Sequence, residues 1–176
     1  MDVYGGTPPP LIVAGGKLPQ EPRKDGEMAD SEKTPFMDAD TYGRSLKGFG
    51  VNILVRDVAT TLAFLQEVLG VEAVYADRDF AVCHHGGQQW MLHSDASYHS
   101  NPLLALTGDG AIRGAGLELR LYGVDPEAAV ARAEDAGHTV LQPPTDKPHG
   151  LREAYIAGPD GYVWVPSVHK AAKPQP

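Results

Sequence analysis

The feature that most constrains the fold of this chain is an internal repeat in its later part. The alternating stretch Asn52–Val58 leads into a helical segment, Thr60–Leu69, and the same order returns at Leu117–Tyr122 and Pro126–Ala136. Both helical segments stop at a glycine. Three short strands are expected after each helix, at 73–75, 80–84 and 88–93 and again at 140–142, 154–157 and 162–165. Two βαβββ units in one chain predict an α+β fold.

The repeat also defines the expected organisation of the chain. A proline-rich and charged N-terminal part has no sustained periodicity, four glycines fall between the two units, and the last residues are polar. We therefore expect a flexible extension at 1–45, a first module at 46–107, a Gly-rich linker at 108–116, a second module at 117–169 and a frayed end at 170–176.

Bulk composition excludes several classes of protein. A formal net charge of −8 and a pI near 5.2 argue against nucleic-acid and anionic-membrane surfaces as partners. No apolar run is long enough to span a bilayer, and the first residues do not resemble a secretory signal. The single cysteine, Cys83, lies between apolar neighbours and is interpreted as a small buried side chain. We expect a soluble cytoplasmic protein.

Each first strand has one apolar face for its helix. In the first unit Val51, Ile53 and Val55 share that face, and either Thr60 or Thr61 is expected to cap the following helix. In the second unit Asp125 is the expected cap. Side chains alternate between the two faces of a strand, and Trp90 and Trp164 fall at positions that point toward the helix. We therefore expect both tryptophans in the core.

The opposite face of each sheet carries a different set of residues, which no helix is expected to cover. This set includes Asn52, Leu54, Glu118, Arg120 and Tyr122. Two curved sheets, each with one helix-covered face, would close their other faces into a cup, and polar and aromatic residues in a cup favour a ligand site. The alternative is the solvated face of an antiparallel sheet.

Two stretches resemble a known family. The strand and helix at 51–58 and 63–70, and the ending Gly150–Tyr162, resemble the vicinal-oxygen-chelate superfamily of glyoxalase I, extradiol dioxygenases and bleomycin-resistance proteins. The ending follows the family pattern G-x-R-E-x-x-x-x-D-P-D-G, with Gly158 in place of the first aspartate. The resemblance implies a cup-shaped, partly open mixed β-barrel with its helices outside, and a homodimer. Its pattern is closest to the bleomycin-resistance-like branch.

The resemblance also implies where relatives hold a metal. The four corresponding positions in this chain are Gly50, Met91, Glu118 and Val165. One oxygen donor out of four does not hold a divalent cation, so no metal and no cofactor are expected. An alternative set of ligands would combine Glu118 with His93, which shares the face of Met91, and with His99.

Three functions remain open from the sequence. The first is metal-free binding of a small molecule, cationic or planar aromatic, that acts by sequestration or resistance. The expected binding residues are Asn52, Leu54, Met91, His93, Glu118, Arg120, Tyr122, Glu153, Tyr155 and Val165. The second is a metal-dependent glyoxalase-type lyase, isomerase or dioxygenase that uses Glu118 with His93. The third is an interaction module based on the N-terminal extension.

Overall fold

The computed structural model describes residues 37–98 and 101–170. In chain order its elements are α1 (Ala39–Ser45), β1 (Asn52–Val55), α2 (Val58–Leu69), β2 (Glu72–Ala76), β3 (Phe80–His85), β4 (Gln88–Ser94), the 3₁₀ helices η1 (Asp95–Tyr98) and η2 (Pro102–Leu106), β5 (Glu118–Tyr122), α3 (Pro126–Asp135), β6 (Thr139–Asp146), β7 (Leu151–Ala157), η3 (Pro159–Gly161) and β8 (Val163–His169).

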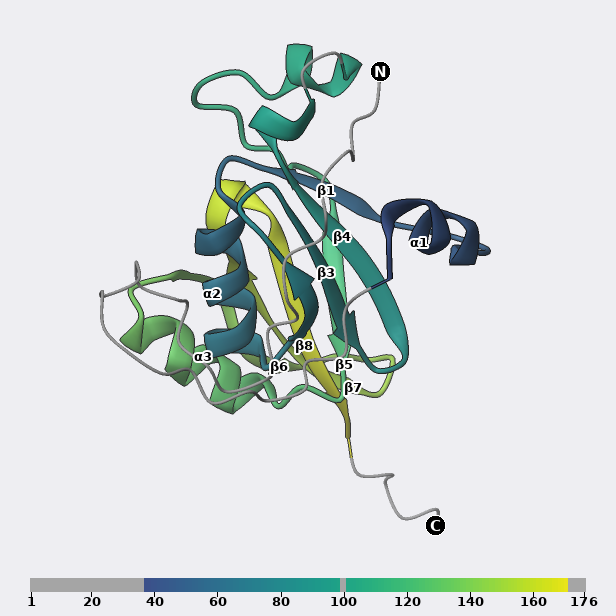
Figure 1. The fold of residues 1–176 in the computed structure, drawn as a ribbon. Helices are drawn as coiled ribbons and strands as arrows, with labels where there is room; N and C mark the ends of the chain where they lie inside the picture. The colour runs from purple at the N-terminus through teal and green to yellow at the C-terminus, as the bar shows by residue number, and fades with distance from the viewer. Residues whose placement is uncertain (1–36, 99–100, 171–176) are drawn as a thin grey trace, which may run out of the picture.

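The two modules have the same strand order. The first sheet runs β1-β4-β3-β2 and the second β5-β8-β7-β6. In each sheet the first strand pairs parallel with the last, and the other neighbours pair antiparallel. The predicted α+β fold of two βαβββ modules is therefore confirmed, and the two sheets form a partly open structure (Figure 1).

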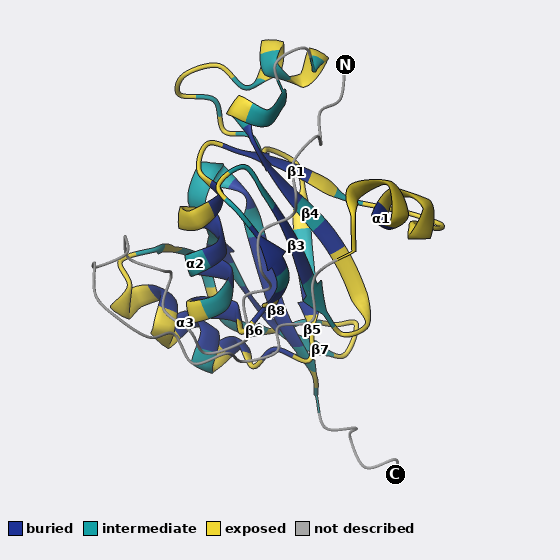
Figure 2. Cartoon of the chain, in the orientation of Figure 1, coloured by how far each residue is buried: buried dark blue, intermediate teal, exposed yellow. Residues whose placement is uncertain are grey.

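One core joins the two modules. Figure 1 shows α2 and α3 on the same side of the strands, and buried residues of both modules belong to one cluster beneath them (Figure 2). The ring centroids of Trp90 and Trp164 lie 5.9 Å apart within it, as their parity predicted. Cys83 is fully buried, and burial raises the pKa of its thiol to about 12. Because both helices cover the same side, the two helix-free faces point to the other side.

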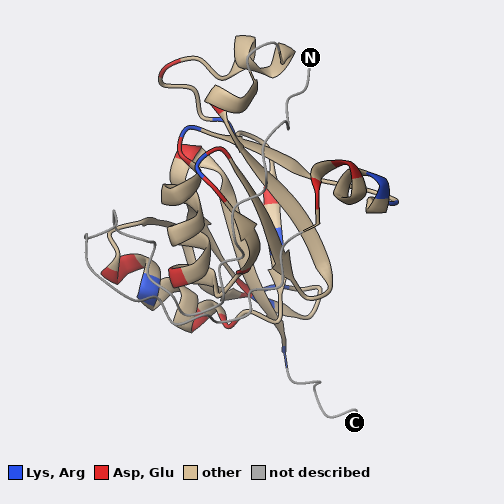
Figure 3. Ribbon diagram, viewed as in Figure 1, with Lys and Arg blue, Asp and Glu red and all other residues tan. Residues whose placement is uncertain are grey.

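Two helix starts differ from expectation. Helix α2 begins before Thr60, because Asp57 is extended and its carboxylate accepts a hydrogen bond from the Thr60 amide; the prediction of Thr60 or Thr61 as cap is wrong. Helix α1 lies within the stretch expected to be flexible. It is capped by Asp38, and an acidic first turn and a basic last turn complement its dipole (Figure 3). Residues 1–36 lie outside the described residues.

The turn between β7 and β8 fastens the second module to the first. The Asp160 carboxylate accepts a hydrogen bond from the Arg56 amide at 3.0 Å and pairs with the Arg56 guanidinium. The Tyr162 hydroxyl donates to the Leu54 carbonyl at 2.9 Å. Gly158 leaves the turn without a side-chain cap, and a Cβ atom there would lie 2.8 Å from Cε1 of Phe64. Glycine at this position thus admits the Phe64 ring.

No helix in the described part of the chain combines the length and apolar character needed to cross a membrane.

Candidate functional site

The helix-free face of the first module is covered by aromatic rings. We call this group the aromatic cluster: Tyr42, Tyr75, Phe80, His93 and Tyr98. The His93 ring lies 4.7 Å from Phe80 and 4.6 Å from Tyr98 between centroids. Tyr42 comes from α1, so the expectation that no helix covers this face is wrong for its α1 side. The short helix α1, with its one buried tyrosine, thus covers part of this face.

Three more predicted residues border the aromatic cluster. Asn52 is exposed and its amide hydrogen-bonds the Tyr98 hydroxyl. Met91 is half-buried and packs against the apolar part of the same face. Leu54 is buried, and its carbonyl is the acceptor for Tyr162 at the junction of the modules. Asn52 and Met91 therefore line the accessible part of the face, whereas Leu54 lies beneath it.

A cavity of about 450 Å³ lies between α1 and the first residues of β4. Its walls include Tyr42 of the aromatic cluster, the exposed ring of Phe49, and Trp90. Gly50 and Met91, two of the four positions at which the resemblance implies a metal in relatives, also line it. The cavity and the aromatic cluster thus share walls on one side of the first module.

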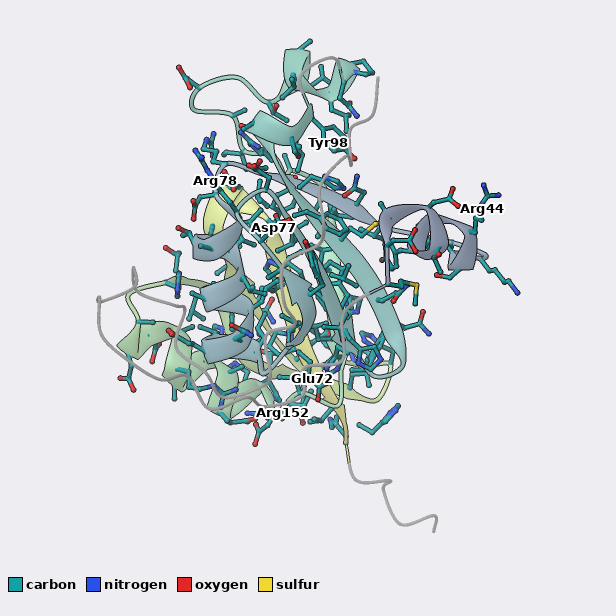
Figure 4. The ribbon with its side chains drawn as sticks, viewed as in Figure 1. Arg44, Glu72, Asp77, Arg78, Tyr98 and Arg152 are labelled. Carbon is teal, nitrogen blue, oxygen red and sulfur yellow. The ribbon has the colours of Figure 1, made fainter. Side chains whose placement is uncertain are left out.

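His93 is the titratable group most affected by this environment. The side chain is 5% exposed, and this burial lowers the pKa of its imidazole, against an opposing effect of the Asp77 carboxylate. Figure 4 shows Asp77 and Tyr98 toward the same end of the first module. The Nδ1 atom of His93 lies 3.3 Å from Oγ of Ser97. The imidazole is therefore held neutral near neutral pH.

We expect stability to depend on pH through His93. Its pKa is lower in the folded than in the unfolded chain, where it is about 6.5. The unfolded state therefore binds more protons, and the contribution of His93 to stability, complete at higher pH, is lost as the pH falls below about 6.5. Urea unfolding between pH 8 and pH 5.5 should show this loss in the native chain and a flatter profile in His93→Gln. Superimposable profiles would contradict the buried neutral imidazole.

The helix-free face of the second module is charged. We call this group the charged cluster: Glu118, Arg120, Lys147, His149 and Glu153. The Glu153 carboxylate is 1% exposed and pairs with the Arg120 guanidinium, with Lys147 Nζ at 3.8 Å and His149 Nε2 at 3.9 Å. Arg120 also donates to Glu118 at 2.8 Å. Glu118 and Glu153, the two carboxylates among the expected binding residues, are thus both already paired with a guanidinium.

Lys147 and His149 were not predicted as site residues. Both lie at the turn between β6 and β7, and the hairpin register that pairs Thr145 with Glu153 brings this turn next to the buried carboxylate. The only indication in the sequence is that both residues lie within a few positions of Glu153. A turn of unknown geometry gives no direction for a side chain, so the sequence could not assign them.

The remaining predicted residues surround the charged cluster. Tyr122 is exposed, with the Arg120 guanidinium 5.9 Å from its ring centroid. Tyr155 is half-buried, with Lys147 Nζ 5.0 Å from its ring centroid. Val165 pairs with Arg120 in the sheet and so shares its face, but it is fully buried and does not reach the surface. Tyr122 and Tyr155 are the members of this set that reach the surface.

Within residues 37–98 and 101–170, no group of three His, Cys, Asp or Glu side chains lies close enough to hold a metal ion. Glu118 is paired with Arg120, and His93 is enclosed by aromatic rings. His99, the third member of the alternative metal site, lies outside the described residues. The described donors thus do not fit a divalent cation.

Comparison with known proteins gives a consistent family assignment. The sequence pattern of the Glyoxalase/Bleomycin resistance protein/Dioxygenase superfamily matches residues 50–165. No curated protein matches the chain.

Solved structures share the fold. A "conserved domain protein" is 25% identical, with a TM-score of 0.56, over 71% of this chain and 100% of its own. A glyoxalase-related enzyme from Fulvimarina pelagi is 20% identical, with a TM-score of 0.55, over 70% and 89% of the two chains. A glyoxalase/bleomycin resistance protein/dioxygenase family enzyme from Burkholderia phytofirmans PsJN is 22% identical, with a TM-score of 0.57, over 68% and 96%.

Proposed function

Because this chain belongs to the Glyoxalase/Bleomycin resistance protein/Dioxygenase superfamily, we propose that it uses the family's cup to bind a small planar molecule without a metal. The observation that carries the proposal is the aromatic cluster on the first module. Its tilted and edge-on rings provide favourable surface for another aromatic ring. The family positions for a metal are Gly50, Met91, Glu118 and Val165, and three of these side chains have no donor of the kind that divalent cations prefer.

The charges favour a planar neutral ligand over a cationic one. Glu118 and Glu153 are both paired with Arg120, and Lys147 adds a second positive charge beside Glu153. A cation would have to displace one of these partners, which leaves a guanidinium or ammonium without its counter-ion. A neutral ring gains contact area with the aromatic cluster and requires no such displacement. Asn52, Met91, Tyr122 and Tyr155 supply the accessible polar and apolar contacts around it.

Binding of 2-methoxynaphthalene tests this function, because the probe is planar, uncharged and lacks a hydrogen-bond donor. We expect saturable binding in isothermal titration calorimetry, unchanged after chelator treatment, and about tenfold weaker in Phe80→Leu through loss of ring contacts. Phe64→Leu is the matched control, because it removes a ring from the helix-covered side and should bind the probe like the native chain. Absence of binding, or equal weakening in both variants, would contradict the proposal.

The superfamily also contains metal enzymes, so the purified protein should be analysed for bound metal. Under the proposal, removal of divalent ions leaves the melting temperature and the affinity for 2-methoxynaphthalene unchanged. A stoichiometric ion whose removal lowers both would instead support the lyase or dioxygenase hypothesis with Glu118 and His93.

A further inference from the structure

A chain of hydrogen bonds fixes the proton of the neutral His93 imidazole on one nitrogen. The Ser97 hydroxyl donates its single proton to the Ser94 carbonyl at 2.8 Å. It can therefore only accept in its 3.3 Å contact with His93, so Nδ1 of His93 carries the proton. The Ser94 side chain holds this turn in place, since its Oγ accepts from the Ser97 amide and donates to Asp79.

The other ring nitrogen is consequently a lone-pair acceptor. Nε2 of His93 has no hydrogen-bond partner among the described residues, and it is not one of the fully buried polar atoms that lack a partner there. It is an acceptor without a partner in a side chain that is 5% exposed.

The surroundings of His93 determine what can approach it. The rings of Phe80 and Tyr98 lie 4.7 and 4.6 Å from the imidazole centroid, so an approaching group meets mostly aromatic surface. An acceptor with so little exposure to water loses free energy when a ligand covers it without supplying a donor. A site of this kind discriminates strongly between a ligand with an O–H or N–H group and the analogue that lacks it.

We propose that Nε2 of His93 accepts a hydrogen bond from the ligand, and that this face therefore selects planar rings bearing one O–H or N–H group. This inference rests on the proposed binding function and adds the chemical class of its ligand. His93 contributes selectivity here, and no covalent step is involved.

The test compares 2-naphthol with its methyl ether, 2-methoxynaphthalene, at pH 7.5. We expect the native chain to bind the naphthol about tenfold more tightly, a ratio that corresponds to one net hydrogen bond. His93→Phe keeps an aromatic ring without the acceptor, and it should bind the two probes equally. His93→Gln keeps an acceptor and should retain part of the preference. Indole and 1-methylindole form a second pair with an N–H donor and should give the same ranking.

Ser97→Ala provides a variant that leaves the imidazole in place. It removes the acceptor that holds the proton on Nδ1, so the preference for 2-naphthol should decrease. Long-range proton–nitrogen NMR of the native chain should show an unprotonated Nε2. A proton on Nε2, or an unchanged preference in both His93→Phe and Ser97→Ala, would overturn the inference.

The same titrations separate the two proposals. Equal affinity of the native chain for both members of each probe pair would overturn the role of His93 and leave planar-ligand binding intact. Failure of every probe to bind would overturn the binding function and the inference together.

Discussion

Gly114→Ala is expected to destabilise the fold by about 3 kcal/mol, because the new methyl group would meet backbone that cannot move aside. A Cβ atom at Gly114 would lie 2.5 Å from Cα of Tyr162 and 2.6 Å from the carbonyl oxygen of Gly161. Both atoms belong to the turn that connects the modules, so relief of the clash requires the linker to separate from that turn. Urea unfolding measures the loss.

Gly108→Ala is the matched control for this substitution. Gly108 lies in the same linker, has open space around its Cβ position and has no left-handed backbone. Its replacement should change the free energy of unfolding by less than about 0.5 kcal/mol. Equal effects of the two substitutions would show that the close approach of Gly114 to Tyr162 does not affect the free energy of unfolding.

Asp160→Ala is expected to cost about 3 kcal/mol, through two additive effects. The Asp160 side chain is 4% exposed and pairs with Arg56, while Nε of the buried Arg113 lies 3.7 Å away. Its removal takes the carboxylate from Arg56 and leaves Arg113 with Asp95 as its remaining carboxylate partner. Asp160 also has a φ of 61°, a conformation that aspartate tolerates better than alanine. Urea unfolding at pH 7.5 measures the total.

Two variants separate these effects. Asp160→Asn keeps the tolerance for positive φ and an acceptor for the Arg56 amide, so it should cost about 1 kcal/mol. Asp40→Ala removes a carboxylate from the exposed Arg44–Asp40 pair and should leave the unfolding midpoint unchanged. A loss in Asp160→Ala no greater than in Asp40→Ala would contradict the role of the turn as a junction.

The repeat could be predicted because hydrophobic periodicity is a local property. The alternation around Asn52–Val55 and the glycine that follows each helical segment indicate strands and helices without knowledge of the rest of the fold. The extent of β6 could not be predicted in this way. It runs over Thr139–Asp146 and includes two prolines, which an edge strand tolerates at a register shift. From the local sequence alone, these two prolines would indicate a loop.

The site could be predicted only as a face. Because side chains alternate between the faces of a strand, the sequence placed His93 and Met91 on one side of β4. It likewise placed Glu118 and Arg120 on one side of β5. The partners of these residues depend on contacts between distant segments. Tyr42 reaches the first face from a helix that has too few residues to show periodicity, and Arg113 of the linker binds Asp95 with two hydrogen bonds of 2.6 Å. Neither contact has a signal in local sequence.

The two modules share an order of strands while presenting different chemistry, with rings on one face and ions on the other. A duplicated scaffold of this kind separates the requirements of folding from those of recognition, because the helix side alone holds the common core. Each outward surface can then change the ligand chemistry it presents without a change in the core that the two modules share.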